Sequence, residues 1–163
     1  MQQVVDCDTT SYGCSGGWTY SAYQYLMQAG GQDSYSSYPY TAQNGQCAFN
    51  KQTIQSTIPS WGWIGQGNEA TMRNYILSTG PLSICADAES WQFYNGGVVM
   101  GSTCGDSVDH CIQITGYTTV SGTDAWIVRN SWGTSWGNSG YLYVQYGVNA
   151  CDISSYPSTN SAK

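Results

Sequence analysis

The sequence contains one histidine, His110. Histidine is the side chain whose ordinary pKa lies nearest to neutral pH. His110 stands in Val108-Asp109-His110-Cys111-Ile112, at the start of an apolar run that predicts a β-strand. A single histidine is more often a structural residue than a catalytic one. Its chemistry therefore depends on what the rest of the chain places beside it.

A second candidate, Asn130, ends the apolar run Trp126-Ile127-Val128-Arg129 and is followed by Ser131-Trp132-Gly133 and then Trp136-Gly137. An amide that indole rings shield from water can hold an imidazole in one orientation, the third role in a nucleophile, base and orienter triad. The alternative interpretation is a glycine-rich turn with aromatic residues in the core. The Asn-Ser-Trp-Gly pattern does not decide between the two by itself.

A third candidate is the segment Gly13-Cys14-Ser15-Gly16-Gly17-Trp18. Paired glycines leave backbone amide and carbonyl groups open, so an extended peptide can bind there as an added strand. A plain turn before a helix is the alternative.

The elements that must position these residues are helical first and β-rich later. Apolar spacing over 17–29, stopped by Gly30-Gly31, predicts one helix, and Asn68 is a good N-cap for a second helix over 70–79. Between them, 35–50 is rich in turn residues and predicts a surface loop held by Cys47. The predicted strands are 82–87, 111–118, 125–129 and 141–146. The fold class is therefore α+β, with an antiparallel sheet or small barrel.

Composition excludes several functions. The 40% hydrophobic and 9% charged content is unlike a disordered chain, and a net charge of −6 without clustered cations argues against nucleic-acid binding. No apolar run is long enough to span a membrane. With a single histidine and no CxxC pair, the sequence predicts no metal site and no cofactor. Seven cysteines favour disulfides and an oxidising compartment.

Six ordered motifs resemble the papain and cathepsin L family of cysteine peptidases. The resemblance runs from the first residue to Cys151 and implies a two-lobe fold, with the remainder of a helical lobe in 1–60 and a mainly β lobe in 61–163. The motifs are Asp6-Cys7 with Gly13 to Gly17, Ser37-Tyr38-Pro39-Tyr40 with Cys47, Gly80-Pro81-Leu82-Ser83, Asp109-His110, Asn130-Ser131-Trp132-Gly133, and Trp136-Gly137.

The resemblance also implies a role for each matching residue. His110 is the general base and acid, Asn130 orients its ring, and Trp132 and Trp136 shield that bond. Peptide or protein substrates would be bound by Gly16, Gly17, Trp18, Cys85, Val108, Asp109 and Cys111.

The family's nucleophile lies in a Cys-Gly-Ser-Cys-Trp segment, which this sequence does not contain. We therefore expect the chain to be the C-terminal three-quarters of a cysteine endopeptidase and to be inactive alone, with the catalytic cysteine in an N-terminal segment of about 50 residues. Cys111 cannot replace it, since neighbours on a strand point to opposite faces. The alternative is a non-catalytic papain-like protein with a binding or structural role.

The resemblance pairs Cys7 with Cys47 and Cys104 with Cys151. Cys85 and Cys111 are extra relative to papain, and since they fall on neighbouring predicted strands we expect a third bridge between them. Each bridge should have a Cα separation of about 4.4–6.8 Å. Cys14 remains unpaired, because its partner belongs to the missing segment. Such a protein would be secreted, or lysosomal or vacuolar.

Overall fold

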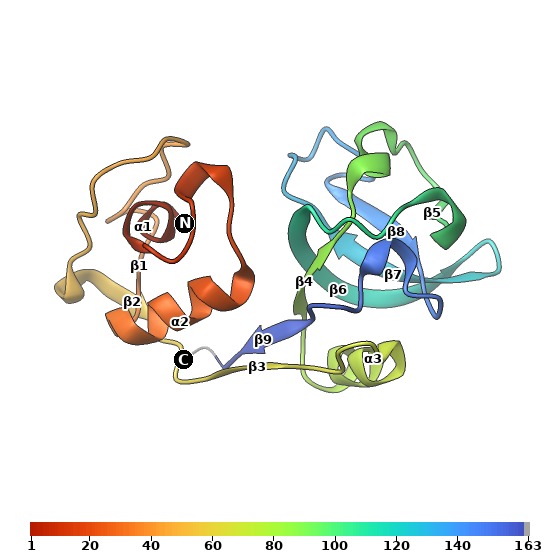
Figure 1. The fold of residues 1–163 in the computed structure, drawn as a ribbon, viewed down its shortest axis with the longest axis horizontal. Helices are drawn as coiled ribbons and strands as arrows, with labels where there is room; N and C mark the ends of the chain where they lie inside the picture. Colours follow the sequence, from red (N-terminus) through yellow and green to blue (C-terminus); the bar gives the residue numbers. More distant parts are fainter. Residues whose placement is uncertain (162–163) are drawn as a thin grey trace. The chain divides into compact units, whose positions relative to one another are not determined.

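Residues 1–161 are described in a computed structural model, in which the chain divides into two units (Figure 1). Unit 1 comprises Met1–Gly62 and the C-terminal segment from Asn160, and unit 2 comprises Trp63–Thr159. The strands β3 (Trp61–Trp63) and β9 (Ser158–Asn160) each include a boundary between the two units.

Unit 1 is built around two α-helices. The predicted helix is present as α2, and it ends at Gly30, whose left-handed backbone lets its N–H bond to the carbonyls of Leu26 and Met27. The helix α1 was not predicted, because the residues that it buries, Gln2 and Gln3, are polar. The elements are α1 (Gln2–Cys7), the 3-10 helix η1 (Gly13–Ser15), α2 (Thr19–Ala29), β1 (Gln32–Asp33), the 3-10 helix η2 (Lys51–Thr53) and β2 (Ile54–Ser56).

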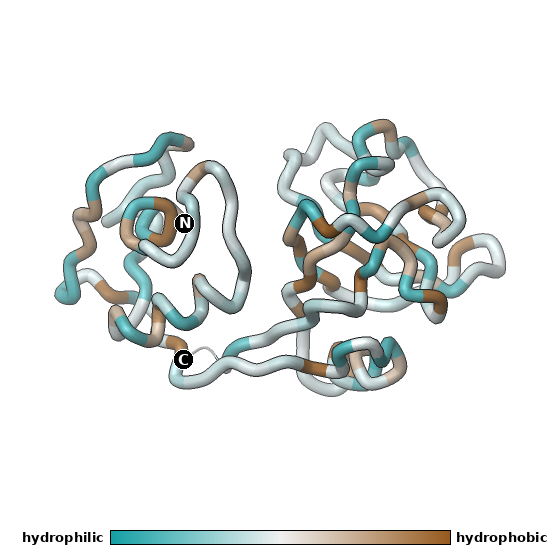
Figure 2. Tube along the Cα trace, viewed as in Figure 1, coloured by the Kyte–Doolittle hydropathy of each residue, from teal (hydrophilic) through white to brown (hydrophobic). Residues whose placement is uncertain are grey.

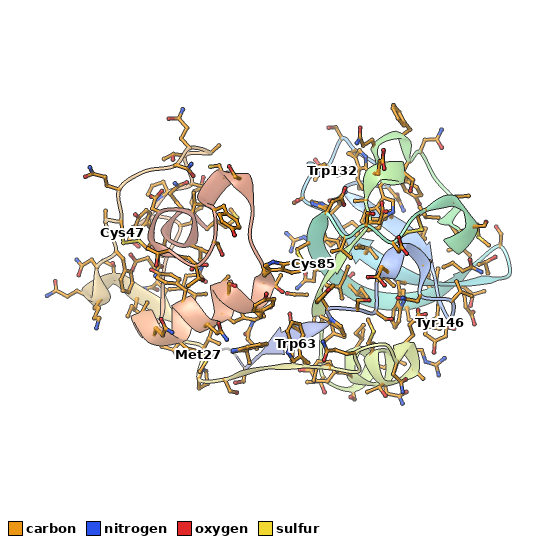
Figure 3. All side chains as sticks on the ribbon, viewed as in Figure 1. Met27, Cys47, Trp63, Cys85, Trp132 and Tyr146 are labelled. Carbon is orange, nitrogen blue, oxygen red and sulfur yellow. A yellow bond between two sulfur atoms is a disulfide. The ribbon has the colours of Figure 1, made fainter. Side chains whose placement is uncertain are left out.

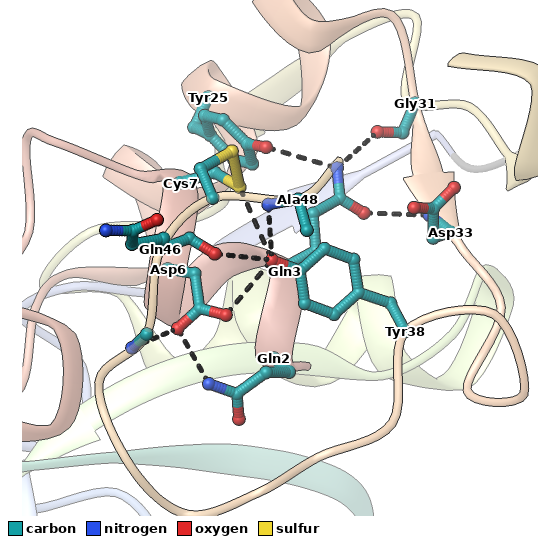
Figure 4. Close-up of a disulfide and its surroundings, with 12 residues drawn as sticks. Gln2, Gln3, Asp6, Cys7, Tyr25, Gly31, Asp33, Tyr38, Gln46 and Ala48 are labelled. Atoms are coloured by element: carbon teal, nitrogen blue, oxygen red, sulfur yellow. Dashed lines mark hydrogen bonds between the residues drawn. A yellow bond between two sulfur atoms is a disulfide. The ribbon is translucent and has the colours of Figure 1, made fainter. Parts of the chain in front are cut away.

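Buried hydrogen bonds connect α1 to the segment that follows α2 (Figure 4). The side chain of Gln3 donates to the Gly31 carbonyl at 3.0 Å and accepts from the Asp33 amide at 2.8 Å. The amide group of a glutamine can donate and accept at once, so its burial is compensated.

The predicted loop 35–50 has no helix or strand and is held against α1 by a disulfide and a tyrosine. Figure 4 shows Tyr38 beside the Cys7–Cys47 bridge, where its hydroxyl donates to Asp6 at 3.0 Å and accepts from the Ala48 amide at 2.9 Å. The loop is therefore fixed without regular secondary structure.

Unit 2 is a sheet with one α-helix. Its order, β3-β9-β4-β6-β7-β8-β5, is open, so the small-barrel alternative is wrong: the edge strands β3 and β5 are too short to close it. The pairs β4–β6, β6–β7 and β7–β8 are antiparallel and β5–β8 is parallel. The elements are β3 (Trp61–Trp63), α3 (Glu69–Ser78), β4 (Leu82–Ala86), the 3-10 helix η3 (Glu89–Phe93), β5 (Val98–Val99), the 3-10 helix η4 (Gly101–Thr103), β6 (His110–Val120), β7 (Thr123–Arg129), β8 (Tyr141–Gln145), the 3-10 helix η5 (Ala150–Asp152) and β9 (Ser158–Asn160).

The core of unit 2 is formed by α3, the sheet and the 3-10 helices η3 and η5. Asn68 caps α3 as predicted, by accepting a hydrogen bond from the Thr71 amide, and the helix buries Met72 and Ile76. Side chains on β8 alternate between buried and partly exposed, which is the pattern of a strand with one covered face. Figure 2 shows hydrophobic residues along the strands of this unit. The buried strand residues of the core include Leu82, Ile84, Ile112, Ile114, Trp126, Val128, Leu142 and Val144.

All three expected disulfides are present, and Cys14 is free and exposed. The Cα separations of 4.8 Å for Cys7–Cys47 and 5.1 Å for Cys104–Cys151 fall in the expected range. The Cα atoms of Cys85 and Cys111 are closer, at 3.9 Å. These two residues are directly opposed in the β4–β6 ladder, where paired Cα atoms are already close before any bridge forms.

Candidate active site

His110 is the first residue of β6, where it pairs with Ala86 of β4. The preceding residue, Asp109, anchors this end of the strand: its amide donates to the Ala86 carbonyl at 3.1 Å, and its carboxylate accepts from the Ala88 amide at 2.9 Å. The backbone that carries the imidazole is therefore fixed by β4 rather than by a free loop.

Asn130 follows β7 directly and is buried, with 9% of its surface exposed. Its Oδ1 lies 2.8 Å from Nε2 of His110 and also accepts from the Ser131 amide at 2.7 Å. Because a backbone N–H can only donate, the atom between Ser131 and His110 must be the amide oxygen. The neutral imidazole therefore carries its proton on Nε2, which leaves Nδ1 to accept a proton.

The orientation of Asn130 has a cost. Within residues 1–161, its Nδ2 is buried and has no hydrogen-bond partner. An unpaired buried donor costs about 1–3 kcal/mol. Oδ1 is thus committed to His110 and Ser131 at the expense of Nδ2, and sites that tolerate such a cost are frequently functional.

One tryptophan packs on His110, and a second tryptophan packs on the first. The indole of Trp132 stacks on the imidazole with ring centroids 5.1 Å apart and an interplanar angle of 27°. Trp136 contacts Trp132 edge-on at 5.0 Å. Figure 3 shows Trp132 on the loop that follows β7. The indole stacked on the imidazole restricts access of water to the hydrogen bond from that side.

Tyr94, which the sequence analysis missed, packs against Trp136. Its ring lies 5.8 Å from that of Trp136, and its hydroxyl donates to the Gly97 carbonyl at 2.7 Å. Burial raises the pKa of Tyr94, and the hydrogen bond from the Tyr143 amide offsets part of that rise. The hydroxyl therefore stays protonated as a donor. The adjacent Gly96-Gly97 turn was the only local signal, and it does not reveal a contact with Trp136.

The loop after Asn130 needs glycine at defined positions. At Gly137, with φ of +55°, a Cβ atom would lie 2.7 Å from the Tyr141 carbonyl and 3.2 Å from the Tyr94 ring. Gly140 has φ of +90°, and its carbonyl accepts a hydrogen bond from the backbone N–H of Asn130 at 2.9 Å. The predicted glycine-rich turn is thus real, and it is the turn that fixes Asn130.

The candidate substrate-binding residues divide between the units. In unit 2, Cys85 is buried, Cys111 and Val108 are partly exposed, and Asp109 is exposed. Gly16, Gly17 and Trp18 are exposed and lie in unit 1.

The two glycines differ in what they offer a ligand. The N–H of Gly16 donates to Gly13 and its carbonyl accepts from Tyr12, so both groups serve the loop itself. In the described part of the chain, the backbone of Gly17 makes no such bond. A Cβ at Gly17 would lie 2.6 Å from the Ser11 hydroxyl. Of the two glycines, Gly17 is therefore the one whose backbone groups are not used by the loop within residues 1–161.

Metal and membrane candidates are not found among residues 1–161. No group of three His, Cys, Asp or Glu side chains is placed to hold a metal ion there. None of the helices in this range has the length and apolar character of a membrane span.

The chain resembles cysteine proteases over almost its whole length. Residues 1–161 match the profile described as papain family cysteine protease. Cysteine proteinase 1 of Dictyostelium discoideum is 43% identical, with coverage of 98% of this chain and 51% of that protein, and cathepsin K of Mus musculus is 40% identical, with coverage of 96% and 49%. This chain thus spans about half the length of these curated relatives.

Solved structures give the same result. Digestive procathepsin L2 proteinase from Tenebrio molitor larval midgut superposes with a TM-score of 0.94 at 33% identity, covering 98% of this chain and 52% of that one. The bromelain protease from Ananas comosus, in complex with the E64 inhibitor, superposes with a TM-score of 0.88 at 33% identity, covering 98% and 76%.

Proposed function

Since this chain belongs to the papain family of cysteine proteases, we propose that it is the part of a cysteine endopeptidase that carries the proton-transfer residue His110 and its orienting residue Asn130. The observation that carries the proposal is the 2.8 Å contact between His110 Nε2 and Asn130 Oδ1, with the Trp132 indole stacked on the imidazole. A nucleophile, a base and an orienter make a complete catalytic set, and the chain supplies the last two.

The tautomer assigns the steps. With its proton on Nε2, His110 takes the proton of a cysteine thiol at Nδ1, and the resulting thiolate attacks the carbonyl carbon of the substrate peptide bond. The imidazolium then gives that proton to the leaving amine, and Nδ1 accepts a proton from the water that hydrolyses the thioester. Throughout, Asn130 holds the ring in this orientation, and Trp132 lies against the ring.

We propose that the nucleophilic cysteine lies outside these residues. Unit 2 contains four cysteines, and all are in disulfides: Cys85–Cys111 and Cys104–Cys151. The sulfur nearest to His110 in sequence, that of Cys111, is therefore not a thiol. An N-terminal segment is the proposed source of the nucleophile, and the chain alone is proposed to be inactive.

The substrate is proposed to be a peptide or protein. The open backbone of Gly17 would pair with an extended substrate, and Trp18 would contact its side chains. Val108, Asp109 and Cys111 would form the surface of the pocket for the main specificity side chain, and the fully buried Cys85 would support it through its disulfide with Cys111. The disulfides support a secreted, lysosomal or vacuolar site of action.

A second candidate is a non-catalytic, papain-like binding protein. It is favoured by the same observation that unit 2 offers His110 no free thiol. The contact between His110 and Asn130 supports the peptidase, because a protein released from catalysis need not keep this pair.

The test is peptide hydrolysis by the longest natural protein that contains this sequence. His110→Gln should lower kcat/KM by about 10²–10⁴-fold, the usual contribution of a positioned base. Asn130→Ala should cause a smaller loss, and the exposed Asn74→Ala on α3 should cause none. Peptide binding without hydrolysis at any pH from acidic to neutral would support the binding protein and overturn the peptidase.

A further inference from the structure

The Cys85–Cys111 disulfide lies one residue pair inside the end of the strand ladder that carries His110. The ladder between β4 and β6 runs from Leu82↔Ile114 to Ala86↔His110, and Cys85↔Cys111 is the pair before the last. Because neighbours on a strand point to opposite faces, the bridge acts on His110 through the backbone and not through contact with the imidazole.

At this end of β6, β4 is the only paired neighbour among the described residues. The pairing of β6 with β7 begins at Gln113↔Arg129, so His110, Cys111 and Ile112 have no partner on β7. Asn130, however, follows β7 directly. The 2.8 Å contact between His110 and Asn130 therefore joins β6 and β7 beyond the last residue pair of their ladder. The position of His110 in this contact is set by the pairing of β6 with β4.

The other ties at this end are weaker. They include the hydrogen bonds from the Asp109 amide to Ala86, from the Ala88 amide to the Asp109 carboxylate, and from the Ser107 amide to the Asp87 carboxylate at 3.0 Å. Asp109 and Ser107 are exposed, so water competes for these bonds. Ends of ladders with exposed hydrogen bonds open most easily, and the covalent bond is the tie that resists opening.

We propose that Cys85 and Cys111 are positioning residues for His110, and that their disulfide makes the His110–Asn130 contact sensitive to redox conditions. The effect on catalysis rests on the function proposed above. The effect on the imidazole does not, and it can be measured without any substrate.

The reaction requires a dithiol or two monothiols as reductant. Cys111 is partly exposed and Cys85 is fully buried, so a reductant thiolate would attack Sγ of Cys111 and displace Cys85 as a thiolate, which takes up a proton. A second reductant thiolate then attacks the reductant sulfur of the mixed disulfide and releases Cys111 as a thiolate, which also takes up a proton. Two electrons pass to the cysteines, and the reductant becomes a disulfide.

A two-sided dependence on reductant follows. A cysteine nucleophile must be kept as a thiol, and this requires some reductant. Stronger reduction opens Cys85–Cys111 and frees the end of β6. The peptidase would then be most active at intermediate reducing strength and lose activity beyond it.

Three proteins separate this mechanism from general damage by reductant. The first is the unmodified protein. Cys85→Val/Cys111→Ala has no bridge to reduce, so the state of its His110 ring should not change with reductant. In Cys85→Ser/Cys111→Ser, two hydroxyls mimic the reduced pair.

The first measurement is ¹⁵N NMR of the His110 ring, which is assigned by loss of its signals in His110→Gln. The oxidised protein should show an Nε2–H imidazole. After treatment with a dithiol, the two nitrogen shifts should move toward each other as the tautomers mix, and the serine variant should show this without reductant. The proposal is overturned by unchanged shifts in the reduced protein, or by an equal response in the Val/Ala variant, which would assign the effect to the other disulfides.

The second measurement is kcat/KM of the longest natural protein in a mild monothiol and in excess dithiol. The dithiol should lower kcat/KM by about 10-fold to 100-fold in the unmodified protein, the scale of a small misplacement of a catalytic group. It should leave the Val/Ala variant unchanged. If reduction changes the nitrogen chemical shifts of the His110 ring but no condition gives peptidase activity, the redox effect on His110 stands and the proposed function is overturned. Activity that is equal in both reductants would overturn the redox tie alone.

Discussion

Removal of the Glu69 carboxylate should destabilise unit 2 strongly. Glu69 is in the first turn of α3 and is buried, with 9% of its surface exposed. One carboxylate oxygen accepts from the Trp126 indole N–H at 2.8 Å and from the Gly147 amide at 3.0 Å, and the other accepts from the Asn149 amide at 2.7 Å. The carboxylate therefore joins α3 to β7 and to the turn after β8.

The magnitude follows from what each change leaves unpaired. Glu69→Ala leaves three hydrogen-bond donors without an acceptor. Each donor that stays buried lowers the free energy of unfolding by about 1–3 kcal/mol. Trp126 is fully buried and bears the whole cost, whereas the two turn amides can regain water through the truncated side chain. We expect a loss of about 3–5 kcal/mol for Glu69→Ala. Glu69→Gln keeps one acceptor but sets an NH₂ group against a donor, so about 2 kcal/mol is expected.

Urea denaturation followed by circular dichroism measures the loss, and exchange of the Trp126 indole proton reports locally on the same bond. Glu89→Ala is the matched control, because Glu89 is an exposed acid in the first turn of η3 and should change stability by less than about 0.5 kcal/mol. The reasoning is refuted if Glu69→Ala is no more destabilising than the control, or if the Trp126 indole proton exchanges at its original rate.

Two further predictions concern unit 1. Burial alone would raise the pKa of Asp8, but the hydrogen bonds from Thr10 and Ser11 outweigh it and lower the pKa. The carboxylate therefore contributes stability above its unfolded pKa of about 3.9, and this contribution is lost as pH falls through the lower folded pKa. Asp8→Asn should flatten the decline of melting temperature below about pH 4, and identical slopes for the two proteins would contradict this. In the 163-residue chain, Cys14 is exposed and free, so this chain should take up one equivalent of iodoacetamide without reductant. The Cys14→Ser variant of the same chain should take up none. Resistance of Cys14 to alkylation would count against its assignment as a free thiol.

Local rules predicted the parts of the fold whose signals are local. The helices α2 and α3 follow from apolar spacing, a cap at Asn68 and a stop at Gly30. The four longer strands follow from apolar runs, and the Cys85–Cys111 bridge follows from reading two of them as neighbours. His110 and Asn130 were candidates by residue type, their roles came from the resemblance of the surrounding motifs to the family, and the structure brings the two side chains into contact.

The missed features depend on contacts between distant residues. Helix α1 is concealed because Gln2 and Gln3 are buried through hydrogen bonds to residues 28 to 41 positions away. The strands β1, β2, β3, β5 and β9 have only two or three residues each, too few for a periodic pattern. Tyr94 acts through Trp136, and nothing in its own segment reveals this. Whether the sheet closes is decided by the edge strands, which carry the weakest sequence signals.

The most direct test of the proposed chemistry is to identify the cysteine that a thiol-directed epoxide modifies in the longest natural protein, by peptide mass spectrometry. We predict modification of one cysteine outside residues 1–163, with the rate lowered at least about 100-fold by His110→Gln, because His110 forms the thiolate. The 163-residue chain alone should not react in a His110-dependent manner. Modification of Cys14 that disappears in His110→Gln would contradict the account, since the nucleophile would then lie within this chain.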